Sequence, residues 1–360
     1  MHTRSARGEG IPGAVADAVT GGPGVAVAPM EGTLPADWRL AEQPLQADTA
    51  VLVSTSGSTG PPKGVLLSRG AIAASVAATH SRLGGPGHWV CPLPLHYVAG
   101  VMTVARAAIG GTRLSVVPSD LSELPRHPGR NYTSVVAAQL HRALASASTT
   151  SALAGFDAVL VGGSAIPASL LADGRAAGIT LIPTYGMAET CGGCVYDGVP
   201  LDGVHVQLGD QGRISLTAPM AFSGYRMDPA ATAATLDGRT VRTHDRGRWT
   251  DGRLQVLGRV DDVVITGGVN VDLGLAQRAS DTEFGPGRLA LLAVPDDRFG
   301  VRIVALTALP LTLEQCRDRL AAQLAPAALP RALRVVAGLP RTSTGKIDRQ
   351  SLHRAWAEGS

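Results

Sequence analysis

The chain contains two lysines, and each lies in a loop rich in glycine, serine and threonine. Lys63 belongs to the segment 54–64, Ser-Thr-Ser-Gly-Ser-Thr-Gly-Pro-Pro-Lys-Gly, and Lys346 ends the segment 339–346, Leu-Pro-Arg-Thr-Ser-Thr-Gly-Lys. Two lysines among 32 basic residues leave 30 arginines. Lysine is a compact, mobile point charge, whereas the arginine guanidinium is a planar fork. We therefore interpret both lysines as residues that act on phosphate groups.

The loop around Lys63 has the groups needed to surround a polyphosphate. Hydroxyls, glycine N–H groups and one ammonium can each donate to phosphate oxygens. The loop is not a Walker A motif, because Lys63 is followed by Gly64 and a strand rather than by Ser or Thr opening a helix. A small-residue surface hairpin is the alternative. The donors that we expect to contact phosphate are Thr55, Ser56, Gly57, Ser58, Thr59, Gly60 and Lys63.

Apolar runs on both sides of this loop predict the strands that position it. Residues 50–53 and 65–67 are apolar and typical of buried strands, so the loop is expected to join them as in a hairpin. The Ala-rich segment 69–80 is compatible with a helix, and 134–138 with a further strand. Residues 1–48, rich in Gly, Pro and Ala, predict a short helix and a loosely packed lead-in.

Residues 157–190 predict a βαβ unit. The pattern gives strand 158–161, loop 162–167, helix 168–177, strand 179–183 and loop 184–190. Such units form parallel strands with helices on the faces of the sheet. Both polar loops follow the carboxyl ends of strands, which is where open α/β sheets bind ligands.

After residue 259 the pattern changes to shorter strands, at 263–265, 289–294 and 302–306, with one amphipathic helix. Thr312 and Gln315 form a capping-box signature, and Leu313, Cys316, Leu320 and Leu324 form one apolar face. We expect an α/β fold with two domains. Residues 1–260 would form a large N-terminal α/β domain with mostly parallel sheets, and 261–360 a small C-terminal α+β domain.

Composition excludes several kinds of partner. The chain has 360 residues, 45% of them apolar, and a net charge of +3 without any basic run, so neither nucleic acid nor a charged membrane surface is an expected partner. No apolar stretch approaches the roughly 18 residues of a membrane helix. Four cysteines do not form a disulfide framework, which favours a reduced, cytoplasmic location. The expected partners are small molecules, and association of identical chains is left open.

The motifs, taken together, resemble the adenylate-forming acyl- and aryl-CoA synthetases, which are related to luciferases and to peptide-synthetase adenylation domains. The resemblance covers about residues 50–352. It rests on six segments in family order: the phosphate loop 55–64, the adenine-side loop 162–165, Tyr-Gly-Met-Ala-Glu-Thr at 185–190, Arg-Thr-His-Asp at 242–245, Gly-Arg-Val-Asp-Asp at 258–262, and the C-terminal loop 339–346.

The resemblance implies a role for each matched residue in nucleotide chemistry. Lys346 would lie between the substrate carboxylate and the phosphate, Glu189 would hold Mg²⁺, and the Thr190 hydroxyl would bond the α-phosphate. Asp245 would accept hydrogen bonds from the ribose hydroxyls, with Arg259 in support. Beside the adenine the resemblance places Gly163, Ser164, Ala165, Tyr185, Gly186 and Met187.

The resemblance also implies an acid pocket, a hinge and a CoA tunnel. His96 would stand at the mouth of the acid pocket, although a core histidine is the alternative, and the other pocket residues would be Tyr97, Gly186, Cys191 and Gly192. Zinc or redox chemistry at Cys191 and Cys194 is the weaker alternative, since no second metal-binding pair is present. Asp261 would be the hinge about which a mobile C-terminal lid swings, with Gly267 and Gly268 at the CoA tunnel.

Three features depart from the family pattern. Only about fifty residues precede the phosphate loop, so the N-terminal subdomain is trimmed. His244 replaces the usual glycine, and Val-Asp-Leu-Gly-Leu-Ala at 271–276 replaces the usual segment after Gly268, which puts the residues of the CoA site in question.

These residues predict an ATP- and Mg²⁺-dependent ligase that joins a carboxylic acid to CoA through an acyl-adenylate. The short chain and the segments 96–100 and 189–194 most resemble the o-succinylbenzoate:CoA ligases of menaquinone biosynthesis. Another aryl- or acyl-CoA ligase and an enzyme that loads a carrier protein are the alternatives. A catalytically inactive nucleotide-binding relative is the alternative outside the enzymes.

Overall fold

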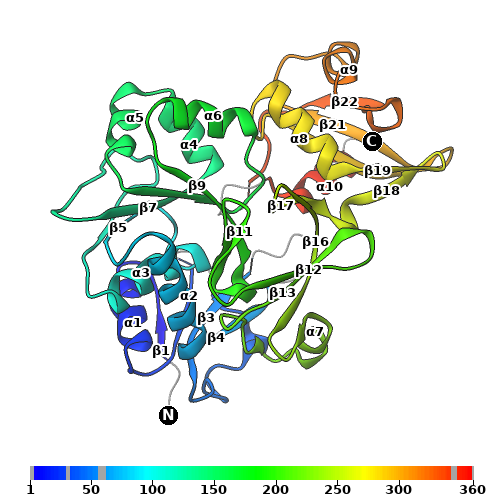
Figure 1. The fold of residues 1–360 in the computed structure, drawn as a ribbon. Helices are drawn as coiled ribbons and strands as arrows, with labels where there is room; N and C mark the ends of the chain where they lie inside the picture. Colours follow the sequence, from blue (N-terminus) through cyan, green and yellow to red (C-terminus); the bar gives the residue numbers. More distant parts are fainter. Residues whose placement is uncertain (1–3, 30–32, 56–61, 342–346, 359–360) are drawn as a thin grey trace.

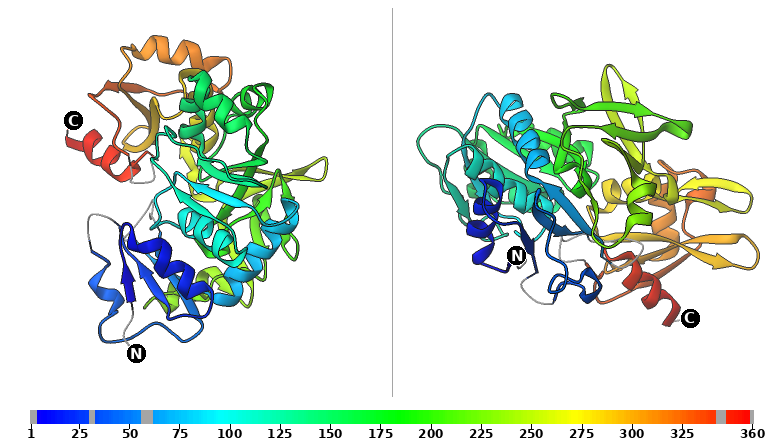
Figure 2. Two further views of the ribbon diagram at one scale, coloured as in Figure 1. Left: turned by 90° about the vertical axis from the view of Figure 1, so that its left-hand side faces the viewer. Right: turned by 90° about the horizontal axis from the view of Figure 1, so that it is seen from below.

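The computed structural model describes residues 4–29, 33–55, 62–341 and 347–358 (Figure 1). The predicted residues Ser56, Gly57, Ser58, Thr59, Gly60 and Lys346 lie outside these ranges. In the described part, the N-terminal elements and the C-terminal elements lie at different ends of the molecule (Figure 2).

The first sheet carries the strands on both sides of the phosphate loop. Its order is β1 (Arg4–Ala6), β2 (Val25–Val27), β3 (Thr49–Ser54), β4 (Gly64–Ser68) and β14 (Gly224–Tyr225), with helices α1 (Gly10–Val19) and α2 (Arg69–Arg82) against it. The first three strands are parallel, whereas β4 is antiparallel to both β3 and β14. The predicted hairpin at 50–67 and helix at 69–80 are confirmed.

The prediction of a loosely packed lead-in is wrong. Val15 and Ala18 of α1 and Val25 of β2 are completely buried, and β2 pairs with β3 inside the sheet. The 3₁₀ turn η1 (Ala36–Trp38) is held by Arg226, whose buried side chain donates to the carbonyls of Trp38, Arg39 and Gln43. The predicted short helix is present as α1, and the region is closely packed because β2 and Arg226 tie it to segments far along the chain.

The second sheet has seven strands and contains the predicted βαβ unit. Its order is β11 (Val199–Pro200), β10 (Gly192–Tyr196), β9 (Leu181–Met187), β8 (Ala158–Gly162), β7 (Asn131–Val136), β5 (His88–Cys91) and β6 (Leu114–Val116). The strands from β9 to β6 are parallel, while β10 and β11 are antiparallel additions. Its helices are α3 (Val98–Ile109), α4 (Ala137–Leu144), α5 (Ala147–Ala154) and α6 (Ala168–Ala176).

Two predicted boundaries in this sheet are corrected. Strand β9 continues through Tyr185 to Met187, where a loop was predicted, because these residues pair with β10. Ala137 and Ala138 begin helix α4 rather than end the strand, with the Gln139 side chain accepting from the backbone N–H of Val136.

The third sheet is antiparallel throughout and supplies the residues around Asp245. Its strands are β12 (His205–Leu208), β13 (Arg213–Thr217), β15 (Leu236–Asp237), β16 (Thr240–Thr250) and β17 (Arg253–Arg259). The 3₁₀ turn η3 (Asp210–Gly212) and helix α7 (Pro229–Thr235) lie between its strands in the sequence. The expectation of mostly parallel sheets therefore fits the seven-stranded sheet, whereas the fold as a whole is α/β with mixed sheets.

The C-terminal elements follow the 3₁₀ turn η4 (Val260–Asp262). They comprise the hairpin β18 (Val263–Thr266) and β19 (Val269–Asp272), the sheet β20 (Leu289–Asp296), β21 (Gly300–Thr307) and β22 (Ala332–Val335), helices α8 (Leu273–Phe284), α9 (Leu313–Ala321) and α10 (Arg349–Glu358), and the 3₁₀ turn η5 (Pro326–Ala328). The predicted capping box is present: Gln315 N–H donates to Thr312 Oγ1 at 3.2 Å. Cys316, Leu320 and Leu324 are buried as the apolar face predicted.

Buried apolar residues form separate clusters in the two parts of the chain. The largest cluster extends from Ala6 to Leu254, whereas the C-terminal clusters begin at Val271. Among the helices in the described ranges, none has the length and apolar character that crossing a membrane requires.

Candidate active site

A hydrogen bond joins the end of the seven-stranded sheet to the antiparallel sheet. Tyr185, on β9, donates its hydroxyl to Asp245 Oδ2, on β16, at 2.8 Å. Burial raises the pKa of Asp245, although the Tyr185 hydrogen bond and the charge of Arg259 act in the opposite direction. Burial and the neighbouring carboxylate also raise the pKa of Tyr185. Tyr185 is therefore held protonated as a donor, and one Asp245 oxygen is fixed in place.

The first sheet is connected to the same region through Tyr225. Its hydroxyl donates to Glu189 Oε1 at 2.6 Å, and the Lys63 ammonium lies 4.8 Å from the centre of its ring. No hydrogen bond or ion pair from another described residue reaches Glu189 Oε2. Tyr225 was not predicted from the sequence, because its strand has two residues and both contacts come from distant parts of the chain.

The described ends of the phosphate loop are tied together. The backbone N–H of Thr55 donates to the Lys63 carbonyl at 2.9 Å, and the Lys63 N–H donates to Thr55 Oγ1 at 3.3 Å. The next residue is Gly64. A Cβ at that position would lie 3.0 Å from the side chains of Arg226, Leu52 and Trp38, which favours glycine there. The geometry fixes Thr55 and Lys63 at the end of the hairpin β3–β4.

Thr190 lies in the turn η2 (Ala188–Thr190), and its hydroxyl is engaged in that turn. It accepts from the Met187 N–H at 3.0 Å and donates to the Gly192 carbonyl at 2.8 Å, and the side chain is completely buried. In this conformation the hydroxyl stabilises the turn that carries Glu189. The predicted contact of Thr190 with phosphate would require these bonds to be exchanged.

Glycines allow β9 and β10 to approach closely beside this turn. A Cβ on Gly186 would lie 2.0 Å from the Gly192 carbonyl oxygen, and Gly192 has a φ of +84°. Cys191 and Cys194 are completely buried in the core, and burial raises the pKa of the Cys194 thiol to about 12. Neither thiol is exposed to a ligand in this conformation, so the cysteines contribute packing behind the turn.

His96 lies in the segment before helix α3, and its ring is tilted by 46° against that of Tyr97 with ring centres 4.1 Å apart. Its Nε2 is buried and has no hydrogen-bond partner in the described part of the chain. Burial lowers the pKa of His96, which favours the neutral imidazole. A buried polar atom without a partner is a candidate for contact with a ligand.

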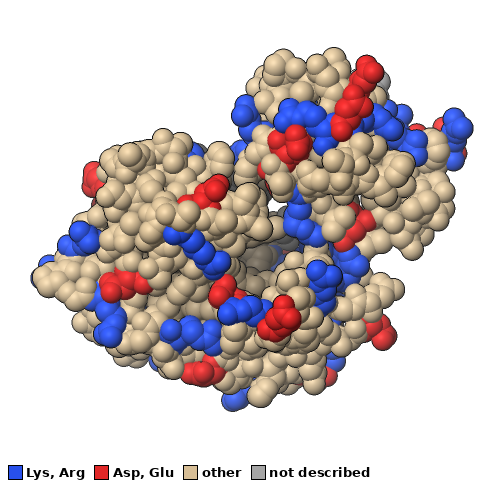
Figure 3. All heavy atoms as spheres, turned by 45° about the horizontal axis from the view of Figure 1, so that its top comes forward, with Lys and Arg blue, Asp and Glu red and all other residues tan. Residues whose placement is uncertain are grey.

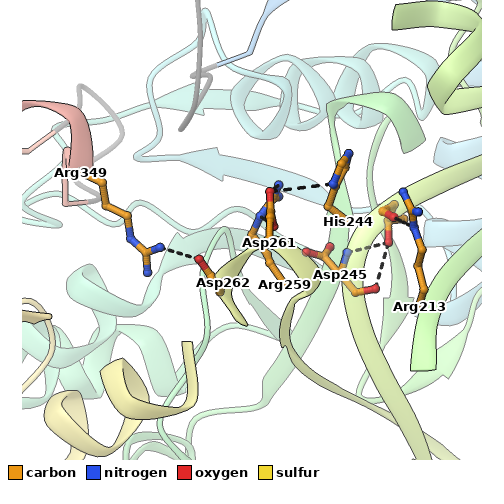
Figure 4. Close-up of polar contacts among 8 residues, drawn as sticks. Arg213, His244, Asp245, Arg259, Asp261, Asp262 and Arg349 are labelled. Carbon is orange, nitrogen blue, oxygen red and sulfur yellow. Dashed lines mark hydrogen bonds and ion pairs between the residues drawn. The ribbon is translucent and has the colours of Figure 1, made fainter. Parts of the chain in front are cut away.

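Charged residues surround the junction between the third sheet and the C-terminal elements (Figure 4). Arg259 donates twice to Asp261, at 2.9 and 2.7 Å, and His244 Nδ1 lies 3.9 Å from Asp261 Oδ2. Burial opposes ionisation of Asp261, but Arg259 outweighs it and lowers the pKa. Across the junction, Arg349 of α10 donates to Asp262 at 2.6 Å.

The remaining predicted residues are placed apart from this network. Gly163, Ser164 and Ala165 form the exposed loop after β8, with Gly163 at a φ of +86°. Gly267 and Gly268 form the turn of the β18–β19 hairpin, which points away from the seven-stranded sheet (Figure 1). On the two sides of the segment that contains Lys346, Arg341 and Ile347 form an antiparallel bridge.

A hollow separates the N-terminal body from the C-terminal elements in the space-filling view, and both basic and acidic side chains lie around it (Figure 3). The three sheets thus bring together the loop end at Lys63, the turn at Glu189 and the Asp245–Arg259 pair beside the junction.

Comparison with known proteins decides the family. Residues 16–221, more than half of the chain, match the family described as "AMP-binding enzyme". The chain belongs to the AMP-binding enzymes. This membership agrees with the adenylate-forming family that the sequence motifs resemble.

Among AMP-binding enzymes, the chain is similar to a protein named probable 2-succinylbenzoate–CoA ligase from Mycobacterium tuberculosis, with 42% identity covering 89% of this chain and 87% of the relative. The 2-succinylbenzoate–CoA ligase of Enterococcus faecalis is 28% identical, over 88% of this chain and 71% of the relative.

The fold is that of solved AMP-binding enzymes. The o-succinylbenzoate CoA synthetase from Bacillus subtilis in complex with the acyl-adenylate intermediate has a TM-score of 0.76, at 23% identity, and the match covers 97% of this chain and 82% of that chain. The same synthetase in complex with AMP gives a TM-score of 0.75, covering 92% of this chain and 78% of that chain.

Proposed function

We propose that this AMP-binding enzyme ligates 2-succinylbenzoate (o-succinylbenzoate) to CoA through an acyl-adenylate, as a step of menaquinone biosynthesis. The observation that carries the proposal is the 42% identity with the probable 2-succinylbenzoate–CoA ligase along nearly the whole of both chains. The residues gathered at the candidate site have the chemistry that this reaction needs.

In the first half-reaction, a carboxylate oxygen of the acid attacks the α-phosphorus of ATP. The new O–P bond replaces the bond to pyrophosphate, which leaves with the electron pair. Both reactants are anions, so the site must supply positive charge where negative charge accumulates. Lys63 and Lys346 are assigned to this work, with Lys63 on the β- and γ-phosphate side and Lys346 at the reacting carboxylate and phosphate.

Asp245 and Tyr185 are assigned to the nucleoside. A carboxylate can accept from two hydroxyls at once, and Asp245 has one oxygen fixed by Tyr185. The charge of Arg259, the strand partner of Asp245, favours the ionised carboxylate and so opposes the effect of burial, which raises the pKa of Asp245. The exposed loop at Gly163, Ser164 and Ala165, with Gly186 and Met187, would border the adenine.

Glu189 fits a magnesium ion. Mg²⁺ is commonly held by one or two carboxylates together with substrate phosphates. Glu189 presents Oε2 without a described partner, while Oε1 is fixed by Tyr225. A Mg²⁺ ion there would neutralise charge on the phosphate oxygens.

The acid is assigned to the region of His96. The Nε2 of the neutral imidazole has no partner in the described part of the chain and can bond to a polar group of the acid, and the Tyr97 ring packs against the imidazole at a tilt. Gly186 and Gly192 would leave room at the reacting carboxylate, with Cys191 packed behind them.

In the second half-reaction, the CoA thiol forms a C–S bond to the acyl carbon, the acyl C–O bond to AMP breaks and the thiol proton is released. Residues 1–260 and 261–360 are proposed as two domains that rearrange about Asp261 between the steps. Their apolar clusters are separate, which supports this division. Gly267 and Gly268 would then line the CoA tunnel. We propose a cytoplasmic location on the basis of the four free, buried cysteines.

The test is a set of parallel incubations of the purified protein with ATP, Mg²⁺ and CoA and one of three acids: 2-succinylbenzoate, benzoate or a medium-chain fatty acid. We expect pyrophosphate release and a thioester of the mass of 2-succinylbenzoyl-CoA. Preference for another acid would change the assigned substrate but would leave the assigned acid–CoA ligase activity in place. Pyrophosphate release without thioester would indicate carrier loading, and no release with any acid would contradict the activity.

A further inference from the structure

One buried tyrosine contacts two oppositely charged residues through different parts of its side chain. The Lys63 ammonium lies over the ring of Tyr225, 4.8 Å from the ring centre. The Tyr225 hydroxyl donates to Glu189 Oε1 at 2.6 Å. Tyr225 is 8% exposed and Glu189 is half-buried, whereas the Lys63 side chain is exposed, so the hydroxyl contact is the more sheltered of the two.

Backbone bonds hold Tyr225 at this point. Tyr225 pairs with Val65 across β14 and β4, two residues after Lys63. Phe222 donates its N–H to the Glu189 carbonyl at 2.9 Å and packs edge-on against the Tyr225 ring at 4.9 Å. The segment 222–225 therefore connects the strand that follows Lys63 to the turn that carries Glu189.

The two charges are kept from each other. Among the residues that the structure describes, no ion pair joins Lys63 to Glu189, although both contact one side chain. A direct ion pair would occupy the ammonium and the carboxylate before any ligand arrived. The aromatic face holds a cation without supplying a counter-charge, and a single phenol hydroxyl occupies only one of the two carboxylate oxygens.

The hydroxyl is suited to remain a donor. Burial raises the pKa of Tyr225, and the adjacent Glu189 carboxylate raises it further. A phenol hydroxyl donates a single hydrogen bond, so the 2.6 Å bond to Oε1 leaves Oε2 of Glu189 available.

We propose that Tyr225 is a positioning residue, which separates Lys63 from Glu189 and directs both toward one metal–polyphosphate complex. The ring sets the ammonium for phosphate, and the hydroxyl orients the carboxylate for the metal ion. This inference rests on the proposed roles of Lys63 and Glu189. It predicts two effects that can be measured separately: phosphate binding, which depends on the ring, and metal binding, which depends on the hydroxyl.

The test uses Tyr225→Phe, which keeps the ring and removes the hydroxyl, and Tyr225→Leu, which removes both. Binding of a non-hydrolysable ATP analogue is followed by calorimetry without metal, and Mn²⁺ binding in the presence of the analogue by electron paramagnetic resonance. Partners of metal ligands typically change metal affinity by about ten-fold or more, so we expect Tyr225→Phe to weaken Mn²⁺ binding about ten-fold. Metal-free analogue binding should be unchanged in Tyr225→Phe and weakened in Tyr225→Leu.

Tyr132→Phe is the matched control, since its buried hydroxyl donates to the Leu83 and Gly85 carbonyls instead. It should leave both measurements as in the wild type. Wild-type Mn²⁺ affinity in Tyr225→Phe would overturn the positioning role, as would equal weakening in Tyr132→Phe. Absence of Mn²⁺ binding in the wild type would instead contradict the metal role of Glu189 in the proposed function.

Discussion

Tyr185 and Asp245 are joined by a 2.8 Å hydrogen bond between the seven-stranded sheet and the antiparallel sheet. The bond stabilises the ionised form of a carboxylate whose burial opposes ionisation. Because the carboxylate is needed in its charged form to accept from ribose hydroxyls, this contact links the packing of two sheets to nucleotide affinity.

Nucleotide binding should weaken as the pH falls. The pKa of Asp245 is raised by burial, so protonation removes its charge at a higher pH than for an ordinary carboxyl. Tyr185→Phe removes a bond that lowers this pKa and should move the loss of affinity to still higher pH. The measurement is the AMP dissociation constant between pH 4.5 and 8. Asp245→Asn should bind AMP weakly, and its affinity should not fall further as the pH is lowered. If the affinity of that variant still falls as in the wild type, the pH dependence belongs to another group.

Lys346→Ala should depress adenylate formation by about a hundred-fold or more, since a group aimed at developing charge acts mainly in the transition state. ATP affinity should change little. Thioester formation from preformed acyl-adenylate should be largely retained. Rapid-quench measurements of the two half-reactions provide the check, and equal losses in both would make Lys346 structural.

Asp261→Pro should separate the two half-reactions. Proline fixes φ and removes an N–H, so it restricts the few residues at which a hinge turns. We expect adenylate formation to continue and thioester formation to collapse. Asp261→Ala is the matched control, since it also removes the contacts with Arg259 and His244 but leaves the backbone free. If Asp261→Pro performs both steps at wild-type rates, the hinge lies elsewhere.

Gly186→Ala should destabilise the fold. The added Cβ would meet the Gly192 carbonyl at 2.0 Å, and crowding of this kind typically costs about 1–3 kcal/mol. Gly70→Ala in helix α2 meets nothing within 4 Å and should instead stabilise by up to about 1 kcal/mol. Urea unfolding of both variants measures the difference. A neutral Gly186→Ala would show that β9 and β10 can separate at this point without loss.

The strands that carry the nucleotide loops could be predicted because local signals agree there. Continuous apolar runs mark β3 and β8, and turn residues follow each of them. The capping box at Thr312 is local in the same way, since donor and acceptor lie three residues apart.

Other features depend on partners far away in the chain. Tyr185 to Met187 form a strand because β10 pairs with them, which no local pattern indicates. The role of Tyr225 depends on Lys63 and Glu189, which come from two other segments. The N-terminal helix α1 buries residues at a helical spacing, so the short helix could be predicted, but the close packing of the lead-in depends on the pairing of β2 with β3 and on Arg226, which lies far along the chain.

The pairing of β14 with β4 has a consequence for the order in which the chain folds. Strand β4 is complete at Ser68, yet its outer partner is made of Gly224 and Tyr225, and Arg226 beside them secures residues 38–43. During synthesis, more than 150 residues must be added after β4 before β14 is available to cover the β4 edge of the first sheet. An uncovered strand edge is a template for unwanted pairing. Fragments that end before residue 224 are therefore expected to associate through β4, and a usable truncation must retain residues 224–226.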